Sequence, residues 1–332
     1  MDIRERTELW EQQYLSDAAT LAVNSKGRKN IDDLCPVRTC FQRDRDRIIH
    51  CNAFRRLKHK TQVFLAPEGD HYRTRLTHTL EVSQIARTIS RALMLNEDLT
   101  EAISLGHDLG HTPFGHAGER ALNQVSSGGF QHYKQSVRVV EKLEKNGKGL
   151  NLTLEVLNGI ECHTKGDWAS TPEGRVVRYA DRIAYINHDI DDALRAGILK
   201  PNSLPSDIVN VLGTSTSERI STLVYSLINN SVGGNLQMDS QVAKAYDDLH
   251  SFMFEYVYNN STAKNEEKKV PQLVEKLYNY YKAHPEKLHS VTQNMVEIEG
   301  IDRAVCDFIA GMTDHYAIQV YSELFVPKRW SY

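Results

Sequence analysis

The sequence lacks the features that mark a membrane protein or a disulfide-rich secreted protein. No apolar run in its 332 residues approaches the length of about 20 residues that a transmembrane helix needs. The first residues, Met1 to Arg6, are charged and have no apolar core, so they do not predict a secretory signal. The five cysteines have no CxxC spacing, which favours free thiols over a disulfide framework or a zinc site. We therefore expect a cytoplasmic protein with no membrane partner.

An excess of charge of one sign is also missing. The formal net charge is −3, and charged residues make up 25% of the chain, so there is no overall polycationic signature for nucleic acid. Alternating strand patterns are scarce, and repeats and low-complexity tracts are absent. We predict one all-α domain over residues 1–332, with a helical core at about 50–200 that holds the functional site and a helical extension at about 201–332.

Helical periodicity accounts for most of the chain. In the segment 75–94 the helical spacing predicts one apolar stripe, formed by Leu76, Leu80, Ile85, Ile89 and Leu93. In the next helix, Asp98 is the predicted cap, with Glu101 three residues later as in a capping box. The other predicted helices are 115–125, 133–145, 153–163, 176–195, 242–256, 270–283 and 301–324.

The densest group of chemically active residues lies between Gly106 and Glu119. It contains three histidines and two carboxylates, a donor set that suits Mn, Fe, Ni, Zn or Mg. His107 and Asp108 are neighbours, about 100° apart on a helix, so both can bind one ion only where a helix end points at it. Gly110 and Pro113 give a reason for a helix to end there.

A second polar group follows one helix face further along the chain. Asp181, Tyr185 and Asp189 are spaced i, i+4 and i+8, so they form a single stripe between apolar residues. This arrangement is unusual for packing and favours a stripe that faces a polar ligand. The structural alternative for Asp181 is an ion pair with Arg178 or Arg182, and for His78 it is a buried histidine with a satisfied hydrogen bond.

The ordered set of His78, His107-Asp108 and Asp181 resembles the HD superfamily of metal-dependent phosphohydrolases. Longer motifs resemble the bacterial dGTPase-like deoxynucleoside triphosphate triphosphohydrolases. The resemblance covers nearly the whole chain. The segments that carry it are 41–50, 54–57, 60–64, 68–78, 107–119, 180–185, 188–192 and 309–314.

The resemblance implies hydrolysis of a dNTP, with dGTP as the leading candidate, to a deoxynucleoside and inorganic triphosphate, and thereby control of dNTP pools. It implies a homo-oligomer, a hexamer or a tetramer. The positions that match metal ligands are His78, His107, Asp108 and Asp181, for Mn²⁺ or Mg²⁺ with Fe, Ni or Zn as substitutes. The positions that match catalytic residues are His111, His116, Glu119 and His132.

Six further positions match substrate-binding residues of the family. Lys58, Arg75 and Arg182 match phosphate contacts. Gln62 matches the residue that binds the sugar 3′-hydroxyl, and Tyr185 and Asp189 match those that pack on and hydrogen-bond the deoxyribose.

The predicted roles agree with the chemistry of phosphoester cleavage. Breaking the P–O5′ bond leaves a poor alkoxide leaving group, so a proton donor is needed, and a histidine suits that task near neutral pH. We predict His116 as this acid, oriented by Glu119 three residues later. His111 has three interpretations: a fifth metal ligand, a phosphate contact or a capping residue.

Two other functions compete with this prediction. One is another HD phosphohydrolase, a nucleotidase or phosphodiesterase, against which Tyr185, Asp189 and Gln62 argue. The other is a nucleic-acid-binding regulator with a vestigial site, against which the complete ligand set argues. Binding of single-stranded DNA through the arginine-rich segment 43–58 is a further prediction. Its alternative is a solvated helix face with internal ion pairs.

Overall fold

The protein is described by a computed structural model, which covers residues 1–62, 73–258 and 266–328. Within these ranges the chain forms helices, and its extended segments form isolated bridges but no sheet. The predicted all-α fold is confirmed. None of the described helices has the length and apolar composition of a membrane span. The predicted family motifs that fall on residues 63–72 lie outside the described residues.

The chain divides into two compact units, each assembled from three separate stretches. The first unit comprises Met1–His50, His78–His107 and Leu150–Ala263, and the second comprises Cys51–Thr77, Asp108–Gly149 and Lys264–Tyr332. The predicted division into a core and an extension near residue 200 stays a prediction.

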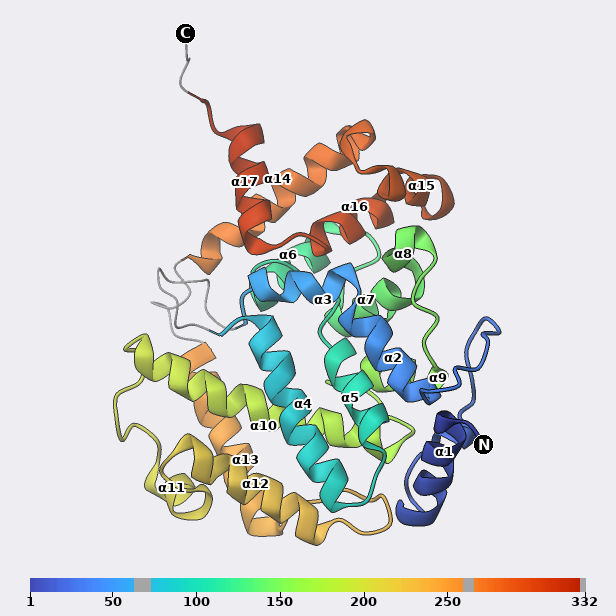
Figure 1. The fold of residues 1–332 in the computed structure, drawn as a ribbon. Coiled ribbons are helices and arrows are strands. Elements are labelled where there is room, and N and C mark those ends of the chain that lie inside the picture. The colour runs from blue at the N-terminus through green and yellow to red at the C-terminus, as the bar shows by residue number, and fades with distance from the viewer. Residues whose placement is uncertain (63–72, 259–265, 329–332) are drawn as a thin grey trace. The chain divides into compact units, whose positions relative to one another are not determined.

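Two long helices, α4 (Arg75–Ala92) and α10 (Pro172–Arg195), carry much of the first unit (Figure 1). α10 starts with Thr171, whose side chain caps the helix by accepting a hydrogen bond from the Gly174 N–H, and with a proline in its first turn. The other elements of this unit are α1 (Ile3–Tyr14), η1 (Ala22–Asn24), α2 (Cys40–Ile49), α5 (Glu97–Gly106), α9 (Leu154–Glu161), α11 (Ser206–Leu212), α12 (Thr216–Asn230), α13 (Ser240–Met253) and η4 (Phe254–Tyr258).

The second unit has its own apolar core. Helix α14 (Val270–Ala283) packs against α6 (Gly115–Val125) and α16 (Ile301–Ala310), with Leu122, Leu277 and Val305 buried among them. The remaining elements are α3 (Asn52–Arg56), η2 (Leu57–His59), α7 (His132–Arg138), η3 (Val139–Leu143), α8 (Glu144–Gly147), η5 (Glu267–Lys269), η6 (Pro285–Lys287), α15 (Ser290–Glu299) and α17 (Asp314–Phe325).

The predicted boundaries of the helices at 115–125 and 270–283 agree with α6 and α14. The predicted cap of α5 is wrong. Asn96, not Asp98, caps this helix, because its side chain accepts hydrogen bonds from the N–H groups of Asp98 and Leu99. The Asp98 carboxylate instead accepts a hydrogen bond from the Gln42 side chain.

Two other sequence predictions are corrected by the structure. The segment 301–324 is not one helix, because α16 ends at Ala310 and Thr313 caps a new helix, α17. The apolar stripe of α4 also differs, since Leu80 is 51% exposed while Val82 and Ile85 are buried.

Candidate metal and active site

Three predicted metal ligands come together in the first unit. His78 Nε2 lies 3.1 Å from Asp181 Oδ1, and His107 Nε2 lies 3.8 Å from the same oxygen. The two imidazole rings are 5.6 Å apart between centroids, and both histidines are buried. Two imidazole nitrogens and one carboxylate oxygen therefore converge, a donor set that fits a divalent cation.

The local fold fixes which ring nitrogen of His107 faces Asp181. His107 follows the last residue of α5, Gly106, and donates a hydrogen bond from Nδ1 to the Ser104 carbonyl at 2.6 Å. This bond leaves the lone pair on Nε2, the nitrogen directed at Asp181. A Cβ at position 106 would lie 2.5 Å from Ile160 Cδ1, so glycine allows the end of α5 to pack this closely.

The surroundings of Asp181 favour its charged form. Burial alone would raise the pKa of its carboxyl, but the hydrogen bond with His78 and the charge of His107 lower it below its ordinary value. A further histidine, His163, is also buried here. Its ring packs edge-on against that of His107, with the two ring centroids 5.0 Å apart. No functional role was predicted for His163.

The fourth predicted ligand, Asp108, belongs to the second unit. Its Oδ2 lies 2.6 Å from Arg75 Nη1, and both side chains are buried. Its Oδ1 lies 3.6 Å from His111 Nε2. Arg75, which was predicted as a phosphate contact, is thus already paired with a carboxylate, a contact that the sequence pattern did not reveal.

The four predicted catalytic residues form one connected group in the second unit. Glu119 on α6 lies between His116, whose Nδ1 is 3.3 Å away, and His132, whose Nδ1 is 3.0 Å away. The backbone N–H of His132, the first residue of α7, also donates a hydrogen bond to Glu119 at 2.9 Å. The His132 ring stacks on His111 with a centroid separation of 4.1 Å.

Members of this group differ in exposure and protonation. The side chain of His116 is 67% exposed, whereas His111 and His132 are buried. Burial would raise the pKa of Glu119, but hydrogen bonds with His116 and His132 lower it far below its ordinary value. Burial, with the nearby charges of Arg75 and His132, lowers the pKa of His111 well below its ordinary value. Glu119 is therefore ionised and His111 neutral at pH 7.

The predicted substrate-binding residues are distributed over both units. In the second unit, Lys58 is an exposed residue of η2, and Gln62 lies before α4 with its carbonyl 3.5 Å from Arg75 Nη2. In the first unit, Arg182 and Tyr185 are partly buried on α10.

Asp189, the last residue of the predicted polar stripe, has a partner that was not predicted. Tyr258 donates a hydrogen bond from its hydroxyl to Asp189 Oδ2 at 2.5 Å. Burial, reinforced by the Asp189 charge, raises the pKa of Tyr258 well above its ordinary value. Tyr258 lies 69 positions away in the sequence, and no local pattern indicates the contact.

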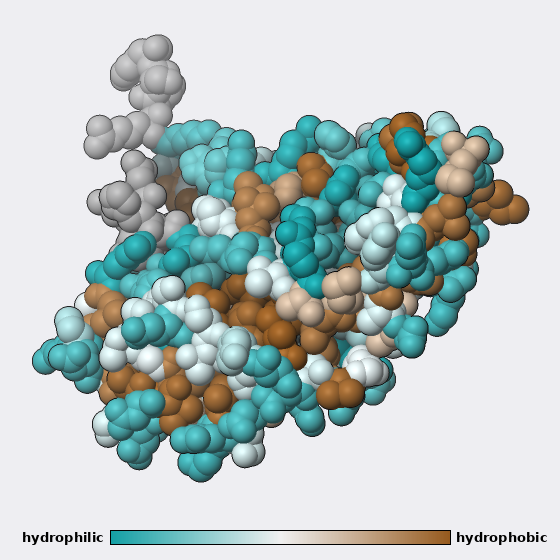
Figure 2. Space-filling view, turned by 60° about the horizontal axis from the view of Figure 1, so that its bottom comes forward, coloured by the Kyte–Doolittle hydropathy of each residue, from teal (hydrophilic) through white to brown (hydrophobic). Residues whose placement is uncertain are grey.

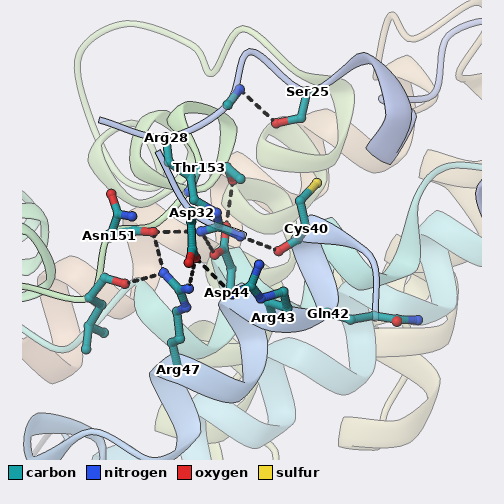
Figure 3. Close-up of polar contacts among 12 residues, drawn as sticks. Ser25, Arg28, Asp32, Cys40, Gln42, Arg43, Asp44, Arg47, Asn151 and Thr153 are labelled. Carbon is teal, nitrogen blue, oxygen red and sulfur yellow. Dashed lines mark hydrogen bonds and ion pairs between the residues drawn. The ribbon is translucent and has the colours of Figure 1, made fainter. Parts of the chain in front are cut away.

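The arginine-rich segment is tied into the first unit by internal contacts (Figure 3). Arg47 Nη1 donates to the Asn151 carbonyl at 2.8 Å, and Arg47 Nη2 pairs with Asp32. Asp44, which is buried, pairs with Arg28. These contacts favour the predicted alternative, a helix with internal ion pairs, while DNA binding by this segment stays a prediction.

Two known domain families match parts of this chain, and related proteins match nearly all of it. The HD domain family matches residues 75–186, and the phosphohydrolase-associated domain family matches residues 236–323. A protein of Caldanaerobacter subterraneus subsp. tengcongensis, called deoxyguanosinetriphosphate triphosphohydrolase-like protein, is 56% identical over 99% of this chain and 98% of its own.

A Clostridium perfringens protein with the same name is 49% identical over 99% of each chain. Among solved structures, a hypothetical protein from Aquifex aeolicus matches with a TM-score of 0.46 and 19% identity, over 86% of this chain and 68% of that one. The chain thus belongs to the HD-domain phosphohydrolases, in the family of the deoxyguanosinetriphosphate triphosphohydrolase-like proteins.

Proposed function

We propose that this protein hydrolyses deoxynucleoside triphosphates to a deoxynucleoside and inorganic triphosphate, using a divalent metal ion, Mn²⁺ or Mg²⁺. The observation that carries the proposal is the convergence of His78 Nε2 and His107 Nε2 on Asp181 Oδ1 in an HD-family chain. Asp108 directly follows His107 in the sequence and is the fourth proposed ligand. The name of the related proteins supports dGTP as the first substrate to test, and control of dNTP pools as the role.

In the proposed reaction, water attacks the α-phosphorus, the P–O5′ bond breaks and O5′ receives a proton. When bound, the metal ion would offset phosphate charge and lower the pKa of a coordinated water. His116 is the proposed proton donor to O5′. Its Nδ1 contacts Glu119, which leaves Nε2 for the leaving oxygen.

The remaining members of the catalytic group hold Glu119 and contact the phosphate. His132 fixes Glu119 through both its ring and its backbone N–H. A neutral His111 can give or accept one hydrogen bond at the phosphate without adding charge. The ionised Glu119 accepts a hydrogen bond from His116 Nδ1 and so orients the ring of the proposed acid.

Substrate recognition is proposed for the six positions that match substrate-binding residues of the family. The triphosphate carries roughly four negative charges, which Lys58, Arg75 and Arg182 would offset. Gln62 and Asp189 would bind the sugar hydroxyl, and Tyr185 would pack on the deoxyribose where a ribose 2′-hydroxyl would otherwise sit. The hydrogen bond from Tyr258 supports this role, because it holds one oxygen of Asp189 in place.

We also propose a homo-oligomer, a hexamer or a tetramer. Figure 2 shows hydrophobic areas between hydrophilic ones on one face of the molecule, and large apolar residues such as Trp10, Leu34 and Tyr225 are exposed. Exposed apolar surface is common at subunit interfaces. Light scattering after size exclusion measures the mass, and a monomer at micromolar concentration would contradict this proposal.

One assay tests the reaction. The protein is incubated with Mn²⁺ or Mg²⁺ and each of the four dNTPs, with GTP as the ribonucleotide control, and products are separated by ion-exchange chromatography. Free deoxynucleoside and triphosphate, with little product from GTP, are expected. Pyrophosphate or orthophosphate as the product would refute the proposed reaction and favour another HD phosphohydrolase.

A further inference from the structure

An acidic residue lies beside a proposed metal ligand on α4. Glu81 follows His78 by three residues, so the helix places both side chains on one face. A ring nitrogen of His78, a carboxylate oxygen of Glu81 and a ring nitrogen of His188 all lie within 4.8 Å of one another. His188 Nδ1 is 2.9 Å from a carboxylate oxygen of Glu81.

The Glu81–His188 pair connects the two helices that carry His78 and Asp181. His188 lies on α10 seven residues after Asp181, which is two helical turns, so both residues face α4. The contacts His78–Asp181 and Glu81–His188 therefore join α4 to α10, about one turn apart on α4 and two turns apart on α10. His188 is 8% exposed in its side chain and Glu81 is 31% exposed.

Metal-binding histidines need a group that fixes the ring. Such a histidine commonly donates its second ring N–H to a carbonyl or carboxylate, which sets the ring orientation and raises the basicity of the ligating nitrogen. His107 has this partner in the Ser104 carbonyl. His78 directs Nε2 at Asp181, so Nδ1 on the other side of its ring is the nitrogen that an orienting group would hold.

We propose that Glu81, anchored by His188, is a positioning residue that orients the His78 imidazole toward the divalent metal ion. The inference rests on the metal ion of the proposed function, but not on the identity of the substrate. A carboxylate three residues after a ligand, held from a second helix, acts on the affinity for the metal rather than on the reacting atoms.

Mn²⁺ binding to the metal-free full-length protein, measured by isothermal titration calorimetry, tests the proposal. Glu81→Ala should weaken binding by about 10- to 100-fold. Glu81→Gln should weaken it less, because an amide oxygen can also accept a hydrogen bond from the ring, although it carries no charge. His188→Gln keeps the carboxylate but loses its anchor, so its effect should also be smaller. Glu286→Gln is the matched control, since Glu286 lies beside an exposed histidine, His284, at 3.4 Å. This control should bind as the wild type does.

The thermal midpoint of the metal-free variants separates positioning from simple helix pairing. If the pair only joined α4 to α10, Glu81→Gln and His188→Gln would lower that midpoint while the Mn²⁺ affinity stayed within about twofold of the wild type, which would overturn the proposal. Two Mn²⁺ ions per wild-type chain and one in Glu81→Ala would also overturn it, since Glu81 would then be a direct ligand.

The same titration separates this proposal from the proposed function. A wild-type protein that binds no Mn²⁺ would overturn the proposal together with the metal assignment. If the Mn²⁺ affinities follow the expected order but the protein cleaves no dNTP, the proposed reaction is refuted and the role of Glu81 is still supported.

Discussion

Asp314 accepts a hydrogen bond from the backbone N–H of Phe114 through Oδ1, at 3.0 Å. Its other carboxylate oxygen accepts a hydrogen bond from the backbone N–H of Thr61, also at 3.0 Å. Phe114 is the N-cap of α6 and has φ of 64°, a left-handed conformation that costs a non-glycine residue about 1–2 kcal/mol. Asp314, far along the chain, therefore holds the start of the helix that carries His116 and Glu119.

Replacing Asp314 should disturb both stability and activity. Asp314→Ala leaves two backbone N–H groups without their acceptor, so the free energy of unfolding should fall by about 2 kcal/mol or more. Because the N-terminus of α6 would lose this support, the rate of the proposed dNTP hydrolysis should fall on the order of tenfold. Urea denaturation and steady-state rates measure the two effects. Asp314→Asn keeps one carbonyl oxygen, so its stability and activity should lie between those of the wild type and Asp314→Ala. An Asp314→Ala protein with wild-type stability and activity would contradict this role of Asp314.

Removing His116 tests the proposed proton donor. His116→Gln should lower kcat by about 10²–10⁴, because the O5′ leaving group would depart without a positioned acid. His116 is largely exposed, so the fold should be unaffected and the thermal midpoint nearly unchanged. His59→Gln, at another exposed histidine, serves as the control and should keep its activity. Near-normal turnover in His116→Gln would assign the proton to another group.

Local patterns predicted the all-α fold and several helix boundaries well, because helices depend on short spacings. The helices at 115–125 and 270–283 and the polar stripe on α10 follow from periodicity. These patterns did not predict which distant residues the candidate site residues contact. Asp108 pairs with Arg75 across 33 positions, and Asp189 with Tyr258 across 69. Such contacts depend on how helices pack, which a period of 3.6 residues does not encode.

The same limit explains the wrong cap of α5 and the broken helix at 311–313. Both Asp98 and Asn96 are acceptable caps by composition, and the choice depends on Gln42 of another helix, which binds Asp98. In the segment 301–324 the apolar spacing continues across Gly311, yet the chain turns there. The turn places the Asp314 carboxylate where it accepts hydrogen bonds from the N–H groups of Thr61 and Phe114.

Gly110 marks a close approach that only glycine permits. A Cβ at this position would lie 2.1 Å from the backbone nitrogen of Ser136 and 2.5 Å from the His132 carbonyl oxygen. Because both neighbours are backbone atoms of α7, Gly110→Ala should displace this helix. We expect a loss of about 3 kcal/mol or more in unfolding free energy, comparable to overpacking a core. Gly128→Ala, where nothing lies within 4 Å, is the control. Equal thermal midpoints for the two variants would contradict this packing.

Arg28, through its ion pair with Asp44, tests how much the internal contacts of the arginine-rich segment 43–58 stabilise the fold. Arg28 pairs with the buried Asp44, so Arg28→Gln leaves an unpaired buried carboxylate and should lower the unfolding free energy by about 3–5 kcal/mol. Arg38→Gln, which removes a more exposed arginine paired with Asp46, should cost below about 1 kcal/mol.

Affinity for single-stranded DNA at low salt, measured by fluorescence anisotropy, completes this comparison. We expect Arg47→Gln, which removes an internally paired arginine, to leave any affinity and its salt dependence unchanged. A clear fall in affinity and in the slope of log Kd against log salt would instead support a DNA-contacting role for the segment 43–58.

Lys60 should make stability depend on pH in the alkaline range. Its side chain is buried and donates hydrogen bonds to the carbonyls of His111 and Ala310. Burial, with the charge of Arg56, lowers its pKa to about 7. Between pH 7 and the ordinary lysine value, the unfolded chain therefore binds more protons at this residue than the folded chain, and the contribution of Lys60 to stability rises with pH.

The Lys60→Met variant isolates this effect. The difference in unfolding free energy, wild type minus Lys60→Met, should increase by about 3–5 kcal/mol from pH 7 to pH 10 and change little from pH 7 to pH 5. Urea denaturation at each pH measures it. Lys58→Met, which replaces an exposed lysine two positions earlier by the same residue, is the control. A difference that falls with rising pH would mean that the folded protein holds Lys60 as a charged ammonium, stabilised by the two carbonyl oxygens that surround it.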